Sequence, residues 1–262
     1  MRGSTGGGLG IVGVLIVLAL GYFFGVDVTP LLQGQGGGQQ SVQTGELTEA
    51  DQAAGQFVSV TLADTEEIWT DIFRAQLGRE YNPATLVLFK GVTQSPCGGA
   101  SGATGPFYCP ADRKAYLDTS FFVTMEQRMG AGGDFAAAYV VAHEVAHHVQ
   151  NELGLLQSMR QTREDSNRQS VRIELMADCL SGVWAAQAQA RFGSLERGDI
   201  QEAMNAAKQV GDDQIQRNAG QVPRPHTFTH GSSEQRMRWF ALGFDRGDIN
   251  ACDTRQIPYA QL

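Results

Sequence analysis

The stretch from Phe135 to Leu153 limits the fold of this chain most strictly, because its pattern predicts a helix with two histidines on one face. Asp134 stands before this stretch, where a capping residue is expected, and Gly154 stands where a glycine commonly ends a helix. His143 and His147 are four residues apart, so they lie one helical turn apart on the same face. Their ring nitrogens can therefore reach one metal ion.

The residue after the first histidine points to a hydrolytic reaction. Glu144 can lean toward the metal without binding it, and its carboxylate can take a proton from the attacking water. The pentad from His143 to His147 is thus the arrangement of a zinc peptidase, with two ordinary helix histidines as the alternative. The metzincin class is excluded, because its pattern requires a glycine and a histidine where this chain has Gln150 and Leu153.

The next predicted helix offers the third protein ligand that a catalytic zinc site needs. Glu174 and Asp178 are four residues apart and share a face, and their neighbours are apolar. A carboxylate among apolar groups needs a partner. We predict that Glu174 binds one zinc ion per chain with the two histidines, and that Asp178 accepts the free N–H of a zinc-bound histidine. The alternative is that both acids face solvent or pair with Arg172.

The first 26 residues predict a membrane anchor. The stretch from Gly3 to Val26 has no charged side chain and is almost purely apolar from Leu9 onward, while a helix of about 20 apolar residues spans a bilayer core. Arg2 before the span and Asp27 after it favour an N-terminus inside and the rest of the chain outside. A cleaved signal peptide and a buried core helix are the alternatives.

A stretch rich in glycine and glutamine separates this span from the rest of the chain. Residues 27–46 cannot bury a core, so we predict a flexible linker there and a catalytic domain over residues 47–262. These boundaries predict a single-pass protein of the cell membrane with its catalytic domain on the extracytoplasmic, periplasmic side.

Composition restricts the partners and the compartment. The chain has 20 Lys and Arg against 28 Asp and Glu, for a net charge of −8, which argues against nucleic-acid binding. Four cysteines allow three pairings, of which proximity and elimination favour Cys97 with Cys109 and Cys179 with Cys252. Two disulfides would suit an oxidising compartment, whereas free buried thiols are the alternative.

The remaining pattern predicts an α+β fold, a helix-rich domain with a small sheet. The Gly- and Pro-rich residues 95–110 are expected to form a loop. Thr162 and Asp165 have capping-box spacing at one helix start, and Ser232 and Gln235 have it at another. The predicted strands cover residues 85–89 and 115–118, and the further helices cover residues 48–77, 122–128, 163–192, 195–210 and 233–242.

Three segments together are typical of a known family. They are His143-Glu-Val-Ala-His-His-Val-Gln150, the stretch from Glu174 to Cys179, and His230-Gly-Ser-Ser-x-Gln-Arg236. With them the chain resembles the bacterial "putative neutral zinc metallopeptidase" family, whose members carry an N-terminal membrane anchor. The pattern is also similar to the wider gluzincin group of peptidases, which implies a zincin-like catalytic domain.

The resemblance implies roles for two further residues. His230 would stabilise the oxyanion of the tetrahedral intermediate, and Arg236 would support the site. Prolines before His230 predict a loop there, which is a reasonable place for a residue that must point into a cleft. His148 points off the ligand face and is expected to be structural, and His226 is expected at the surface.

These observations predict a zinc-dependent endopeptidase that acts on a peptide or protein. The strand from Lys114 to Leu117 would offer a free edge for pairing with an extended substrate. Two alternatives stay open. One is a catalytically inactive, zinc-binding, membrane-anchored protein that binds partners, and the other is a hydrolase of cell-wall peptides.

Overall fold

The computed structural model describes residues 26–27, 48–101 and 105–262, which fall into two compact units. The first unit holds the described residues up to Val60 together with Ala84–Phe121, and the second holds Thr61–Pro83 and Phe122–Leu262. The predicted anchor and linker lie almost wholly outside the described residues. Among the helices of the described part, none combines the length and the apolar character that crossing a bilayer requires.

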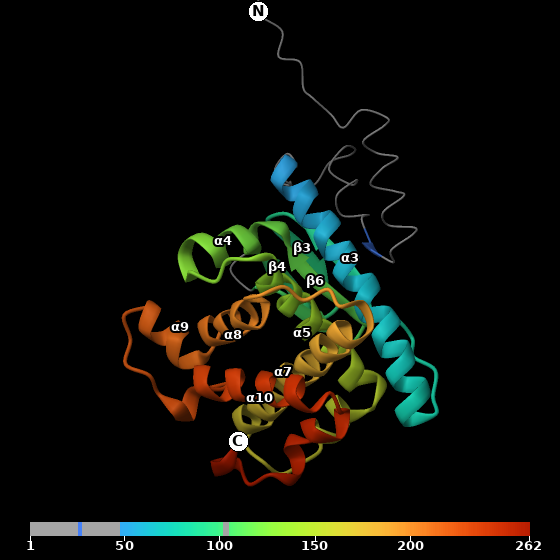
Figure 1. The fold of residues 1–262 in the computed structure, drawn as a ribbon. Coiled ribbons are helices and arrows are strands. Elements are labelled where there is room, and N and C mark those ends of the chain that lie inside the picture. The colour runs from blue at the N-terminus through green and yellow to red at the C-terminus, as the bar shows by residue number, and fades with distance from the viewer. Residues whose placement is uncertain (1–25, 28–47, 102–104) are drawn as a thin grey trace, which may run out of the picture. The chain divides into compact units, whose positions relative to one another are not determined.

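A small mixed sheet organises the first unit (Figure 1). Strand β6 pairs with β2 in parallel and with β5 in antiparallel orientation, and β2 also pairs in parallel with β1. The strands predicted at 85–89 and 115–118 are confirmed and are neighbours in this sheet. In spatial order the strands are β1 (Val26–Asp27), β2 (Thr85–Phe89), β6 (Lys114–Asp118) and β5 (Phe107–Cys109).

Two predictions for the first unit are wrong. Residues 95–110 are not a loop, because β3 (Val92–Ser95) and β4 (Gly98–Ser101) form an antiparallel hairpin and β5 follows. These strands have only three or four residues each, and β4 begins with two glycines, so they show no periodic pattern in the sequence. The strand from Lys114 also has no free edge, because β6 has a neighbour on each side. It therefore cannot pair with an extended substrate.

Helices make up the second unit, and the chain passes between the units within α3, just before β2 and within α4. Helix α3 ends in a π-helical turn, Phe73–Leu77, and short 3-10 turns follow α9 and α10. The fold class predicted from the sequence, helix-rich α+β with a small sheet, is confirmed. The helices are α3 (Glu49–Ile72), α4 (Thr119–Met129), α5 (Asp134–Glu152), α6 (Leu155–Arg160), α7 (Ser166–Phe192), α8 (Asp199–Gln209), α9 (Asp212–Asn218) and α10 (Ser233–Arg246).

Local hydrogen bonds decide where the helices of the second unit begin. The predicted capping box at Ser232 and Gln235 is present at the start of α10. The one predicted at Thr162 is not, because the Asp165 carboxylate accepts the N–H groups of residues 167 and 168, so that α7 starts three residues later. At α5 the capping position belongs to Gly133 and not to Asp134. The short helices α6 and α9 were not predicted.

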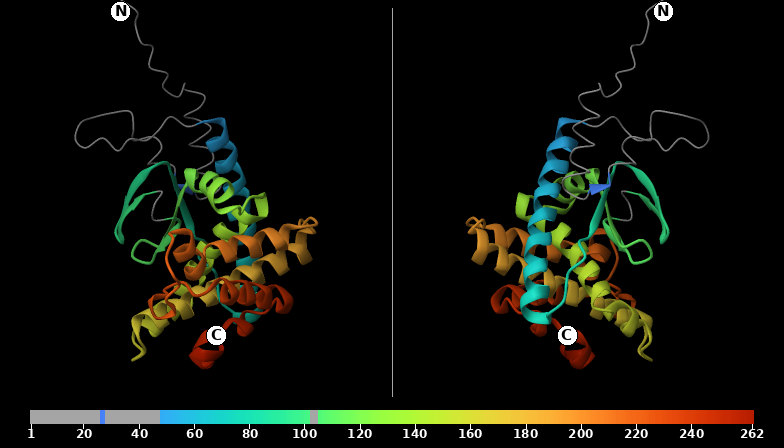
Figure 2. Two further views of the ribbon diagram at one scale, coloured as in Figure 1. Left: turned by 90° about the vertical axis from the view of Figure 1, so that its left-hand side faces the viewer. Right: turned by 90° about the vertical axis from the view of Figure 1, so that its right-hand side faces the viewer.

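Helices α7 and α10 run side by side at backbone contact (Figures 1 and 2). A Cβ atom added at Gly243 of α10 would lie 1.9 Å from the carbonyl oxygen of Cys179. One added at Gly182 of α7 would lie 2.1 Å from the carbonyl oxygen of Phe240. Only glycine fits at either position, so this pair of residues brings α10 close to the buried face of α7.

Replacement of Gly243 by alanine should destabilise the second unit by about 3 kcal/mol, because its methyl group would overlap the Cys179 carbonyl. Gly55→Ala is the matched control within a helix. A Cβ atom there would lie 3.6 Å from Leu88 Cδ1, an ordinary contact, and alanine favours a helix by up to about 1 kcal/mol. Urea unfolding followed by circular dichroism measures both variants. Equal unfolding midpoints would contradict the backbone contact.

Candidate metal centre

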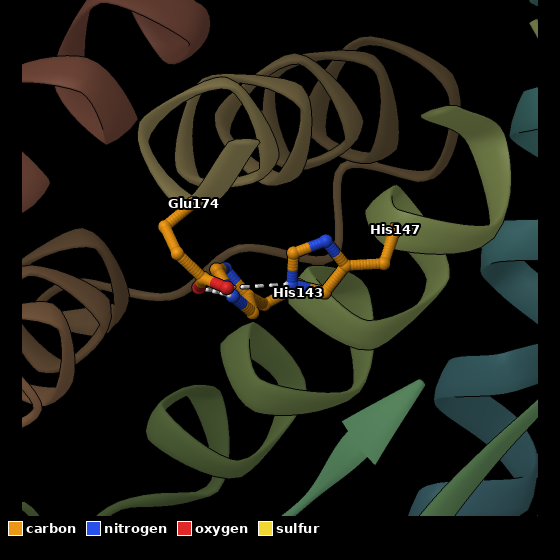
Figure 3. A group of neighbouring side chains, drawn as sticks. All are labelled: His143, His147 and Glu174. Atoms are coloured by element: carbon orange, nitrogen blue, oxygen red, sulfur yellow. Dashed lines mark hydrogen bonds and ion pairs between the residues drawn. The ribbon is translucent and has the colours of Figure 1, made fainter. Parts of the chain in front are cut away.

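Three potential ligand side chains converge from α5 and α7 in the second unit (Figure 3). Glu174 of α7 faces both histidines of α5, with its Oε2 3.1 Å from Nε2 of His143 and its Oε1 3.5 Å from Nε2 of His147. One ligand atom from each residue lies within 4.8 Å of those of the other two. The structure thus brings together the three ligands that the sequence predicts.

Asp178 fixes the ring of His143. Its Oδ1 lies 2.9 Å from His143 Nδ1. Since a carboxylate only accepts hydrogen bonds, the proton of the neutral imidazole belongs on Nδ1, and Nε2 keeps the lone pair that a metal needs. This is the geometry that the predicted role of Asp178 requires.

Asp178 itself is fully buried and is held by two further residues. The hydroxyl of Tyr139 donates to Oδ1 at 2.6 Å, while Arg236 donates from Nε to Oδ2 at 2.8 Å and from Nη2 to Oδ1 at 2.9 Å. A buried charge is tolerated when it is paired and its lone pairs are used, as they are here. Arg236 was predicted to support the site, whereas Tyr139 was missed. Its position four residues before His143, on the same helix face, could have indicated it.

Opposite charges set the pKa values in the site. Burial lowers the pKa of His143, but the carboxylates of Asp178 and Glu174 outweigh burial and raise it to about 9. Burial raises the pKa of Glu174, yet the two histidines hold it well below its usual range. Burial also raises the pKa of Asp178, but the charges of Arg236 and His143 outweigh burial, so that this pKa is lowered. Without a metal, the site therefore pairs ionised carboxylates with a protonated imidazole.

Glu144 is buried beside the ligands and has an unused oxygen. Within the described part of the chain, its Oε2 has no hydrogen-bond partner. Burial raises the pKa of this carboxyl, against the lowering effect of the two histidines. An orphaned buried oxygen costs free energy unless a ligand or a reaction uses it. Two imidazoles, one carboxylate and this free acceptor fit a catalytic zinc site, which has three protein ligands and an open position.

His230 is not part of the buried cluster. Its side chain is half exposed, and its Nδ1 lies 3.1 Å from Oδ1 of Asp212. Oδ2 of Asp212 accepts the backbone N–H of His230 at 2.6 Å and those of both its neighbours. In the described residues, no hydrogen bond or ion pair joins His230 to the three potential ligands. Asp212 was missed, because it lies in a short helix that has no periodic signal.

The other residues considered from the sequence have structural surroundings. His148 is buried, and its Nε2 donates to the carbonyl of Asn82 at 2.7 Å, which confirms its structural role. Arg172 pairs with Glu164 at 2.7 Å and not with the predicted ligand. The disulfides join Cys97 with Cys109 and Cys179 with Cys252, the pairing that proximity favours.

A second group of acids lies at the N-terminus of α5. Ligand atoms of Asp134, Asp199 and Glu202 are within 4.8 Å of one another. Asp134 and Glu202 both accept the backbone N–H of Phe135. The partial positive charge of a helix N-terminus accounts for acids at this place.

Comparison with known proteins identifies the family. The model of the family "Putative neutral zinc metallopeptidase" matches residues 1–255. The chain belongs to this family. It is 45% identical over 250 residues to "Uncharacterized protein YpfJ" of Escherichia coli K12, covering 94% of this chain and 86% of YpfJ. It is 46% identical over 184 residues to "Uncharacterized protein Rv2575" of Mycobacterium tuberculosis H37Rv, covering 66% of this chain and 63% of Rv2575. No solved structure matches the chain.

Zinc affinity should weaken as pH falls, because below about pH 9 the metal must displace the proton that His143 binds. We expect a loss of at least about tenfold for each pH unit between about pH 8 and about pH 6, because Glu174 raises the pKa of His147 against the effect of burial and zinc must displace a proton there as well. Competition with a chelator of known proton affinity measures this dependence on the full-length chain. An affinity that stays constant over this range would show that zinc does not replace a proton of the site.

Proposed function

We propose that the chain is a zinc-dependent endopeptidase. The proposal rests on the convergence of His143, His147 and Glu174 beside a buried carboxylate oxygen of Glu144 that has no hydrogen-bond partner in the described part of the chain. Membership in a family described as zinc metallopeptidases supports it. A zinc ion held by the three ligands would act as a Lewis acid and make an attacking water acidic near neutral pH.

Glu144 is the base of the proposed reaction. Its Oε2 has no hydrogen-bond partner among the described residues and lies close to the ligands, so it can take a proton from the attacking water. Burial raises its pKa, which strengthens it as a base once it is ionised and lets it return the proton to the leaving amine nitrogen. The enclosed surroundings strengthen each charge interaction, since little water screens them.

His230 and Arg236 have different parts in this proposal. Arg236 acts on the reaction through its neighbours: its guanidinium holds Asp178, which in turn holds His143, and its Nη2 lies 4.0 Å from Oε2 of Glu174. His230 is more exposed, and Asp212 holds its Nδ1. In its protonated form, His230 can donate from Nε2 to the oxyanion that develops on the substrate carbonyl.

Glu144→Gln should retain zinc and lose peptidase activity by about 1,000-fold, because an amide cannot accept the proton. Glu174→Gln should lose zinc and activity together, since it removes an anionic ligand. Zinc per chain is measured by plasma mass spectrometry, and cleavage is measured on an unfolded protein. Glu152→Gln, at the end of helix α5, which also carries Glu144, is the control and should retain both zinc and activity. Full activity of zinc-loaded Glu144→Gln would refute the proposed mechanism.

The same assay separates the alternatives. Wild-type protein that binds zinc but cleaves neither unfolded protein nor purified wall peptide would favour the inactive, partner-binding protein. Cleavage of wall peptide alone would identify a cell-wall peptide hydrolase.

We also propose that the chain is anchored in the cell membrane by residues 1–26, with its catalytic domain outside the cytoplasm. The charge-free apolar run from Leu9 to Val26 supports the anchor. The two disulfides support an oxidising compartment.

Carbonate washing of membranes should therefore leave the full-length chain in the pellet. Protease added outside spheroplasts should degrade residues 47–262. A chain that stays protected until the spheroplasts are lysed would contradict the external placement, and release by carbonate would contradict the anchor.

A further inference from the structure

Gln150 is a fully buried amide that contacts both helices of the metal centre. It lies on α5, three residues after His147, and its Oε1 is 3.0 Å from Nδ1 of that histidine. Its Nε2 donates to the carbonyl oxygen of Ile173 on α7 at 2.7 Å. Ile173 immediately precedes Glu174 in the sequence. One side chain thus connects a ligand on one helix with the backbone next to a ligand on the other.

The carbonyl of Ile173 decides which way the amide of Gln150 faces. A carbonyl oxygen only accepts hydrogen bonds, so the amide nitrogen must face Ile173 and the amide oxygen must face His147. The amide oxygen is also only an acceptor. The proton of neutral His147 therefore belongs on Nδ1, and its Nε2 keeps a lone pair. Figure 3 shows the His147 ring turned toward Glu174, whose Oε1 lies 3.5 Å from this Nε2.

We propose that Gln150 is a positioning residue of the metal centre, which holds His147 in the Nδ1–H tautomer and fixes its distance from Glu174. The proposal rests on the proposed zinc function, because it concerns the same ligands. His143 offers a parallel, since the Asp178 carboxylate receives its Nδ1–H. Each imidazole thus has its own acceptor, one charged and from α7, the other neutral and from α5. Such partners commonly orient the ligand and raise its affinity for the metal.

Gln150→Met tests the proposal, because methionine has a similar length and forms neither hydrogen bond. His148→Met is the matched control. It introduces the same side chain at another buried position of α5 and removes the hydrogen bond to Asn82. Both variants are expected to lose stability. Only Gln150→Met is expected to bind zinc about 10- to 100-fold more weakly than the wild type. Competition with a chelator measures zinc affinity on the folded, full-length chain.

A measurement on the wild-type protein keeps the proposal testable if Gln150→Met does not fold. Nuclear magnetic resonance of the zinc-loaded chain with nitrogen-15 histidine shows which ring nitrogen carries the proton. The His147 signals are assigned by correlating the ring nitrogens with the backbone of this residue. We expect the proton on Nδ1 and zinc on Nε2. Zinc on Nδ1 of His147 would overturn the proposal.

The outcomes separate this proposal from the proposed function. If the wild type binds zinc and the two methionine variants weaken zinc binding equally, Gln150 is a packing residue and the proposed function is unaffected. If the wild type binds zinc without cleaving any peptide, the peptidase function is overturned, and the ratio of zinc affinities still decides the role of Gln150. If the wild type binds no zinc, both proposals are overturned.

Discussion

The candidate site depends on the buried carboxylate of Asp178. This side chain lies on α7, and its two oxygens receive hydrogen bonds from Tyr139 and His143 of α5 and from Arg236 of α10. Three helices therefore meet at one charged group. A buried ion is stable only when its partners are all in place, because removing one leaves an uncompensated charge. The ring of His143 consequently takes its orientation from contacts among three helices and not from α5 alone.

Contacts along α7 keep α10 and the end of the chain next to this network. Gly182 and Gly243 let the backbones of α7 and α10 touch. Cys179, the residue after the central aspartate, is bonded to Cys252 beyond α10. Arg172, two residues before Glu174, donates hydrogen bonds to the backbone carbonyls of Thr254 and Ile257. The segment of α7 that carries Glu174 and Asp178 is thus held at both ends by parts of the chain distant in sequence.

Two of the three acids in the site are paired with basic side chains, and Glu144 is the exception. Glu174 has histidine partners, Asp178 has an arginine partner, and both have lowered pKa values. Glu144 instead has a raised pKa and an oxygen without a partner in the described structure. Two acids with opposite shifts within one site are typical of residues with different tasks, one binding and one transferring protons. The surroundings hold the three potential ligands near one another, with one ligand atom of each within 4.8 Å of those of the other two.

The sequence by itself determined the long helices of the site, α5 and α7, and the candidate ligands on them. The spacing of His143 and His147 is a local property of one helix, and Glu174 and Asp178 share a face for the same reason. Helix caps were predicted less well, because several residues compete for the same backbone groups, and the short strands were missed because they are too short to show a period. Only the tertiary structure decided that Gln150 lies between two ligand helices and that His230 lies apart from the ligands. Contacts between distant segments depend on how whole elements pack, and helical periodicity carries no information about that packing.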